Sequence, residues 1–122
     1  TTCEADYCSS LLLFSSPTLE GEWRYHPGNP LSGHLRNVRN AGAIFQAGGR
    51  LFRPSQSARG GYGSSFTLNE IVRLTETDYE ERPVNTVEAI GLPNMVGTHT
   101  YGRTDAWEVV DGCFALPESD VL

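Results

Sequence analysis

Two stretches of this sequence repeat one pattern, in which two short segments rich in β-forming residues flank a turn that contains glycine. The first is residues 40–56, where Gly48-Gly49 would form the turn, and the second is residues 98–112, which end in Asp111-Gly112. Both have the spacing of antiparallel β-hairpins. Thirteen glycines and seven prolines separate the short apolar runs, so no helical period of useful length remains. The sequence therefore predicts an all-β, antiparallel fold.

Hairpins that recur along a chain are typical of a β-propeller, in which antiparallel sheets surround a central channel and ligands bind at its rim. The chain has 122 residues, 39% hydrophobic and 20% charged, which is enough for one ordered domain. We expect a mobile lead-in at residues 1–10, propeller blades over residues 11–114 and a tail at residues 115–122.

The longest predicted strand, residues 66–74, has Glu70 on the same face as four apolar residues, Phe66, Leu68, Val72 and Leu74. A carboxylate on an apolar face needs either a bulge that redirects it or an arginine partner. Residues 55–65 are predicted to form a loop. Residues 75–81 have the composition of a single helical turn that a proline ends, followed by an outer strand at 82–87 and a linker at 88–97. Trp23 and Trp107 alternate with polar neighbours, which favours packing between blades over a sugar-stacking platform.

Charge and composition exclude several classes of function. The nine basic residues are all arginine and stand against fifteen acidic ones, giving a net charge of -6, which argues against nucleic-acid binding. Without lysine the chain has no amine for a Schiff base. The longest apolar run, Leu11–Phe14, is far shorter than a membrane span.

The cysteines lack the spacing of a metal site, so no metal or cofactor is expected. A bridge between Cys3 and Cys8, a bridge between Cys8 and Cys113, and free thiols all remain open. Because a few blades alone would leave unpaired strand edges, we expect a homodimer, a place in a longer chain, or rearrangement into a compact sandwich.

Several motifs occur in an order and spacing that resemble a known family. They are the run Leu12–Pro30, Arg39-Asn40-Ala41-Gly42, the run Gly49–Gln56 with Tyr62-Gly63 and Leu68-Asn69-Glu70-Ile71, and His99-Thr100-Tyr101 with Val110-Asp111-Gly112. Together they resemble the later part of the propeller domain at the N-terminus of plant glucosamine inositolphosphorylceramide transferases, which also occurs in many uncharacterised bacterial proteins. Asn40 departs from the family, which usually has proline at that position.

The resemblance implies a five-bladed propeller similar to those of arabinanase- and xylosidase-type glycoside hydrolases, of which this chain would hold about two and a half blades. In those hydrolases the catalytic carboxylates come from the first three blades, which have no counterpart here. The resemblance therefore implies a carbohydrate-related module without a complete catalytic set.

Candidate ligand-binding residues lie in and beside the two hairpins. His99 would face the channel and bind a sugar hydroxyl, or else bond a backbone carbonyl as a structural histidine. Arg39 and Arg53 flank the first hairpin and would hold a carboxylate or a vicinal diol, or else pair with Glu70 or Asp111 inside the sheets. Gln56 and Tyr62 lie in the following loop, where an amide and a phenol suit sugar recognition, although such loops are more often simply solvated.

Glu70 and Asp111 are the carboxylates nearest to the motifs, and a glycosidase would need two such groups facing each other. Asp111-Gly112 also has the composition of an ordinary β-turn. The first hypothesis is a glycan-binding propeller module of a glycosyltransferase- or glycosidase-like protein. The alternatives are a non-catalytic interaction or scaffold domain, and a glycoside hydrolase that uses Glu70 and Asp111.

Overall fold

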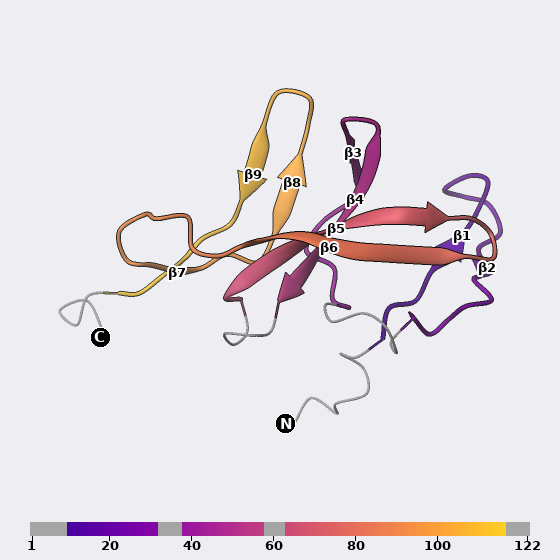
Figure 1. Ribbon diagram of the computed structural model, residues 1–122, viewed down its shortest axis with the longest axis horizontal. Helices are drawn as coiled ribbons and strands as arrows, with labels where there is room; N and C mark the ends of the chain where they lie inside the picture. The colour runs from indigo at the N-terminus through magenta and orange to yellow at the C-terminus, as the bar shows by residue number, and fades with distance from the viewer. Residues whose placement is uncertain (1–9, 32–37, 58–62, 117–122) are drawn as a thin grey trace.

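The computed structural model describes residues 10–31, 38–57 and 63–116, and these residues form strands and connecting turns without an α-helix (Figure 1). Every strand pair is antiparallel, which confirms the predicted all-β class. The strands are β1 (Phe14–Ser15), β2 (Arg24–Tyr25), β3 (Phe45–Ala47), β4 (Arg50–Ser57), β5 (Ser65–Leu74), β6 (Tyr79–Val87), β7 (Met95–Gly97), β8 (Tyr101–Arg103), β9 (Glu108–Val110) and β10 (Cys113–Phe114).

The central element is a four-stranded sheet in the order β3-β4-β5-β6, in which each strand pairs with the next one along the chain. The β3–β4 turn is made by Gly48 and Gly49, whose φ angles of +56° and +75° are readily adopted only by glycine. Three two-stranded sheets, β1-β2, β8-β9 and β7-β10, complete the fold. The β8-β9 hairpin rises on the same side as the β3-β4 hairpin (Figure 1).

The two faces of the central sheet differ in chemistry because side chains alternate along each strand. One face is polar and buried, and it consists of Arg53, Ser55, Ser57, Ser65, Thr67 and Asn69. Hydrogen bonds within this face satisfy much of its polarity: the Asn69 amide donates to Ser55 Oγ at 2.7 Å and to the Arg53 carbonyl at 3.0 Å. The other face is largely apolar.

The apolar face holds the core, in which Ala41, Phe66 and Tyr101 are buried. The Tyr101 ring lies 5.2 Å from that of Phe45 and 5.5 Å from that of Phe66, measured between centroids. The segment before β3 joins the hairpins, since Ala41 N–H donates to the Pro54 carbonyl at 3.0 Å and Tyr101 N–H donates to the Ala41 carbonyl at 2.8 Å.

Glu70 is buried and forms an ion pair with Arg82 at 2.7 Å. This confirms the expectation of an arginine partner. The register of β5 against β6 also shifts between Ile71 and Arg73. The predicted apolar face ends earlier than expected, since Val72 and Leu74 are exposed. Beyond this shift the β5-β6 ribbon continues to the right-hand border of the view in Figure 1, where β1-β2 is also drawn.

Several sequence expectations were wrong in detail. Tyr79–Glu81 belong to β6, not to a helical turn, because pairing with β5 outweighs the local preference. The expected linker contains β7, which pairs with β10, and the expected loop at 55–65 is shortened by β4 and β5 at its two ends. Trp23 and Trp107 were expected in the core, but they are 53% and 74% exposed.

Candidate functional site

Asp111 organises the segment that carries His99. Its Oδ1 accepts hydrogen bonds from the backbone N–H groups of His99 at 2.8 Å and Thr100 at 2.7 Å, and from Thr98 Oγ1 at 3.3 Å. Its Oδ2 forms an ion-pair contact with His99 Nδ1. The His99 and Asp111 side chains are 28% and 33% exposed, so part of the pair remains accessible to solvent. The sequence-predicted candidates His99 and Asp111 therefore act together.

The same donors control the charge of Asp111. Burial alone would raise the pKa of this carboxyl group, but the backbone hydrogen bonds from His99 and Thr100 and the nearby imidazole lower the pKa to about 2. The carboxylate is consequently ionised at neutral pH. It can orient an imidazole, but it holds no proton to donate as a general acid.

We expect the stability that Asp111 contributes to disappear in acid. Folding lowers the pKa of Asp111 from its ordinary value of 3.8. The contribution of its carboxylate to stability is therefore complete above about pH 5 and is lost as the pH falls towards 2. Thermal unfolding of the wild type and of Asp111→Asn should therefore give a Tm difference that is largest above pH 5 and shrinks towards pH 2. A Tm difference that stays constant from pH 6 to pH 2 would show that the carboxylate charge is not responsible.

Backbone hydrogen bonds link the segments that carry Arg39 and Gln56 to the segment that carries His99. The Gln56 N–H donates to the Arg39 carbonyl at 2.8 Å. Ala41, two residues after Arg39, accepts the N–H of Tyr101, which is two residues after His99. A Cβ built on Gly63, at the start of the segment leading into β5, would lie 3.8 Å from the His99 ring. Arg39 is exposed and Gln56 half-buried. Tyr62, the remaining candidate from this loop, lies outside the described residues.

Arg53 has a different environment from the other candidates. It is 2% exposed and makes a bidentate ion pair with Glu81, with N–O distances of 2.7 and 2.6 Å, and it donates to Asn40 Oδ1 at 2.9 Å. Burial alone would lower the pKa of Arg53, but the hydrogen bonds and charge of Glu81 outweigh it and raise that pKa. The expected acidic partners were Glu70 or Asp111, so sequence reasoning missed Glu81. No local signal identified Glu81, because it becomes a neighbour of Arg53 only when β6 pairs with β5.

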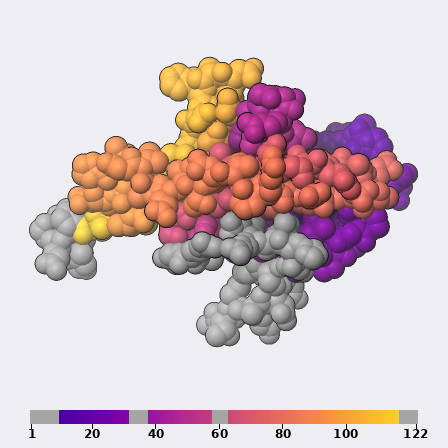
Figure 2. Space-filling model, viewed as in Figure 1, coloured from indigo at the N-terminus to yellow at the C-terminus, as the bar shows by residue number. Residues whose placement is uncertain are grey.

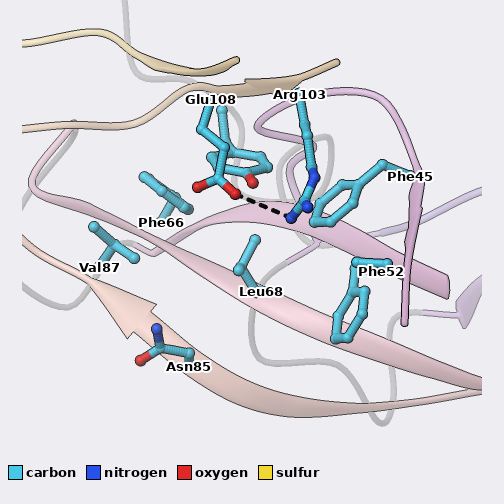
Figure 3. Close-up of a pocket in the computed structure, with 10 residues that line it drawn as sticks. Phe45, Phe52, Phe66, Leu68, Asn85, Val87, Arg103 and Glu108 are labelled. Carbon is cyan, nitrogen blue, oxygen red and sulfur yellow. Dashed lines mark ion pairs between the residues drawn. The ribbon is translucent and has the colours of Figure 1, made fainter. Parts of the chain in front are cut away.

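A hollow of about 250 Å³ lies between the β8-β9 hairpin and the apolar face of the central sheet (Figure 3). Phe45, Phe52, Leu68 and Val87 line it, and Asn85 stands at the side. The ion pair between Arg103 and Glu108, at 3.0 Å, lies on the hairpin side. Sequence reasoning did not identify this hollow, because it depends on how two separate sheets pack.

Among the described residues there is no group of three or more histidine, cysteine or acidic side chains arranged to hold a metal ion. Cys113 is an exposed free thiol, which leaves a bridge from Cys8 to Cys113 without support, while Cys3 and Cys8 lie outside the described residues. No helix in the described part of the chain is long and apolar enough to span a membrane.

Known proteins resemble this chain over most of its length. Residues 2–103 match the family model described as glucosamine inositolphosphorylceramide transferase 1, N-terminal. Proteins named glucosamine inositolphosphorylceramide transferase 1 from Oryza sativa subsp. indica and Oryza sativa subsp. japonica are each 40% identical to it over 96 residues. The alignment covers 75% of this chain but 13% of each rice protein, and no solved structure matches. This chain therefore belongs to the family defined by the N-terminal region of glucosamine inositolphosphorylceramide transferase 1.

Proposed function

We propose that this chain is a carbohydrate-related module of a glycosyltransferase-like protein, and that it contacts a glycan or sugar conjugate without supplying a complete catalytic set. Family membership supports this proposal, since the rice relatives are named glucosamine inositolphosphorylceramide transferase 1. Because the chain spans 13% of their length, the chemistry of transfer is assigned to the protein as a whole and not to this segment.

The fold that fits this proposal is part of a five-bladed-type β-propeller, with about two and a half blades in this chain. The four-stranded meander β3-β4-β5-β6 has the topology of one blade. The β8-β9 hairpin stands beside β3-β4, as the inner strands of a following blade would (Figure 1). The β1-β2 hairpin would then be the remainder of a preceding blade.

The proposed ligand-contacting edge consists of His99, Asp111, Arg39 and Gln56. The observation that carries it is the set of contacts made by the Asp111 carboxylate, which fix the backbone of residues 98–100 and orient a partly exposed imidazole. An oriented imidazole, an amide and a guanidinium provide directional hydrogen bonds to sugar hydroxyls. Arg53 and Glu70 instead stabilise the sheet, because each is buried in an ion pair.

Substitution of His99 tests this edge. We expect His99→Ala to weaken sugar binding about 5- to 10-fold, the effect of losing one hydrogen bond to a ligand hydroxyl. A glycan array identifies the ligand and isothermal calorimetry measures the affinity. Gln46→Ala, an exposed change in β3, is the matched control and should leave affinity unchanged. The proposal fails if the wild type binds no sugar, or if His99→Ala binds as tightly as the wild type.

A non-catalytic interaction domain is the second candidate. The exposure of Trp23 and Trp107 favours it, since tryptophan is enriched at protein–protein interfaces. The hydrolase alternative has less support, because Asp111 is ionised and Glu70 is held by Arg82 at 2.7 Å and by Arg50 at 3.9 Å.

A further inference from the structure

The β8-β9 hairpin carries its charged side chains on the face that covers the central sheet. Arg103 and Glu108 lie opposite each other in the register, and both line the hollow above the apolar face of that sheet (Figure 3). The turn of this hairpin projects as a separate lobe (Figure 2), and Val109, on the hairpin's other face, is 62% exposed. Burial of apolar area alone would favour the reverse arrangement, with the valine inside. Departures of this kind from the hydrophobic pattern are expected where side chains serve a function.

The hollow has an apolar side, formed by the sheet, and a polar side, formed by the hairpin. The residues drawn on the sheet side are Phe66, Leu68 and Val87 (Figure 3). On the hairpin side, Arg103 Nη1 lies 3.0 Å from Glu108 Oε1. The Tyr101 hydroxyl shares this side: burial is the main cause that raises the pKa of Tyr101, Arg103 opposes the rise and the charge of Glu108 adds to it. Polar groups that converge on an apolar hollow are the usual mark of a small-molecule site.

We propose that this hollow binds one neutral pyranose ring, with a C–H face of the sugar on the apolar side and its hydroxyls at Arg103, Glu108 and Asn85. The volume of the hollow, about 250 Å³, is smaller than the roughly 300–1,000 Å³ of sites for drug-sized ligands, which suits a single ring. The inference rests on the proposed sugar contact and adds a second place for it, because none of the described residues that line the hollow belongs to the proposed ligand-contacting edge.

Charge and bonding capacity favour a neutral sugar as the occupant. The charges of Arg103 and Glu108 cancel, so the hollow selects neither an anion nor a cation. The guanidinium donates hydrogen bonds, the carboxylate accepts them, and the exposed Asn85 amide at the margin does both, as sugar hydroxyls also do. Because the ion pair is already formed, its side chains lose little further freedom when a ligand binds. A wholly apolar ligand would instead cover these polar groups without bonding them.

Amide NMR spectra of the 122-residue protein test the ligand and its place. We expect neutral methyl pyranosides of gluco, galacto or manno configuration, at millimolar concentration, to shift the resonances of Leu68, Val87 and the Arg103 side chain. Glucuronate, which adds a carboxylate to the same kind of ring, should bind no more tightly than the best neutral pyranoside. Indole probes the rival occupant, a flat apolar ring. The inference is overturned if none of the pyranosides shifts these resonances, if glucuronate binds more tightly than all of them, or if indole does.

Three variants, called the hollow variants, test whether the sugar lies in the hollow. Glu108→Gln and Asn85→Ala should each weaken pyranoside binding about fivefold, the effect of one lost hydrogen bond. Ala47→Leu fills part of the hollow from β3 and should abolish the shifts, while thermal melts show an intact fold. Glu80→Gln is the matched control, because it makes the same change as Glu108→Gln at an exposed position of β6, and it should leave the affinity unchanged.

The proposed ligand-contacting edge is judged separately by His99→Ala in the same titration. If binding falls in His99→Ala but not in the hollow variants, the inference fails and the edge stands. If binding falls in the hollow variants but not in His99→Ala, the inference stands and the edge fails. If the wild type binds no sugar at all, here or on the glycan array, both fail.

Discussion

Arg53→Met should lower the free energy of unfolding by about 3–5 kcal/mol, the usual cost of removing one partner of a buried ion pair. The substitution would leave the Glu81 carboxylate, 3% exposed, without its bidentate partner, and Asn40 Oδ1 without its donor. Domains of this size are commonly stable by only about 5–15 kcal/mol, so a large part of the folded state's margin would disappear. Urea unfolding followed by circular dichroism measures the loss.

Two further variants separate the buried ion pair from a general effect of removing charge. Arg103→Met removes an arginine from a solvent-exposed pair with Glu108 and should cost less than about 1 kcal/mol. In Arg53→Met combined with Glu81→Leu, no buried charge is left unpaired, so much of the loss should be recovered. Equal losses for Arg53→Met and Arg103→Met would contradict a dominant role for burial.

The strands of the central sheet could be predicted because their signals are local. Gly48-Gly49 marks the first hairpin, and the alternation of residues 66–71 marks the start of β5. The segment that begins β6 could not be predicted in the same way. Its acidic, helix-compatible composition is overruled by hydrogen bonding to β5, a partner that the local sequence does not reveal.

Arg53 shows why the candidate site was only partly predictable. Its face of the sheet is polar, and a polar face ordinarily indicates solvent or a ligand, whereas here it is buried and satisfied by hydrogen bonds and an ion pair. The partner, Glu81, lies 28 residues away and becomes adjacent only when β6 is added to the sheet. Sequence spacing contains no record of that contact.

His99 and Asp111 were each identified from motifs, but their contact was not. They are 12 residues apart, and they meet because the β8-β9 hairpin returns the chain to its starting point. The same hairpin exposes Trp107 at its turn. Whether an alternating tryptophan packs inward depends on which sheet lies opposite, and for Trp107 none of the described strands does.

Gly42→Ala should destabilise the protein by about 2–3 kcal/mol, because it forces two hairpins apart. A Cβ at Gly42 would stand 1.9 Å from the Tyr101 carbonyl oxygen, well inside contact distance, and neighbouring Ala41 accepts the Tyr101 N–H at 2.8 Å. Both groups are backbone, so neither can turn aside as a flexible side chain would. Gly102→Ala is the matched control: no atom lies within 4 Å of its added Cβ, and it should change stability little. If thermal melts show equal losses for the two variants, close approach of the hairpins at Gly42 is not what stabilises their contact.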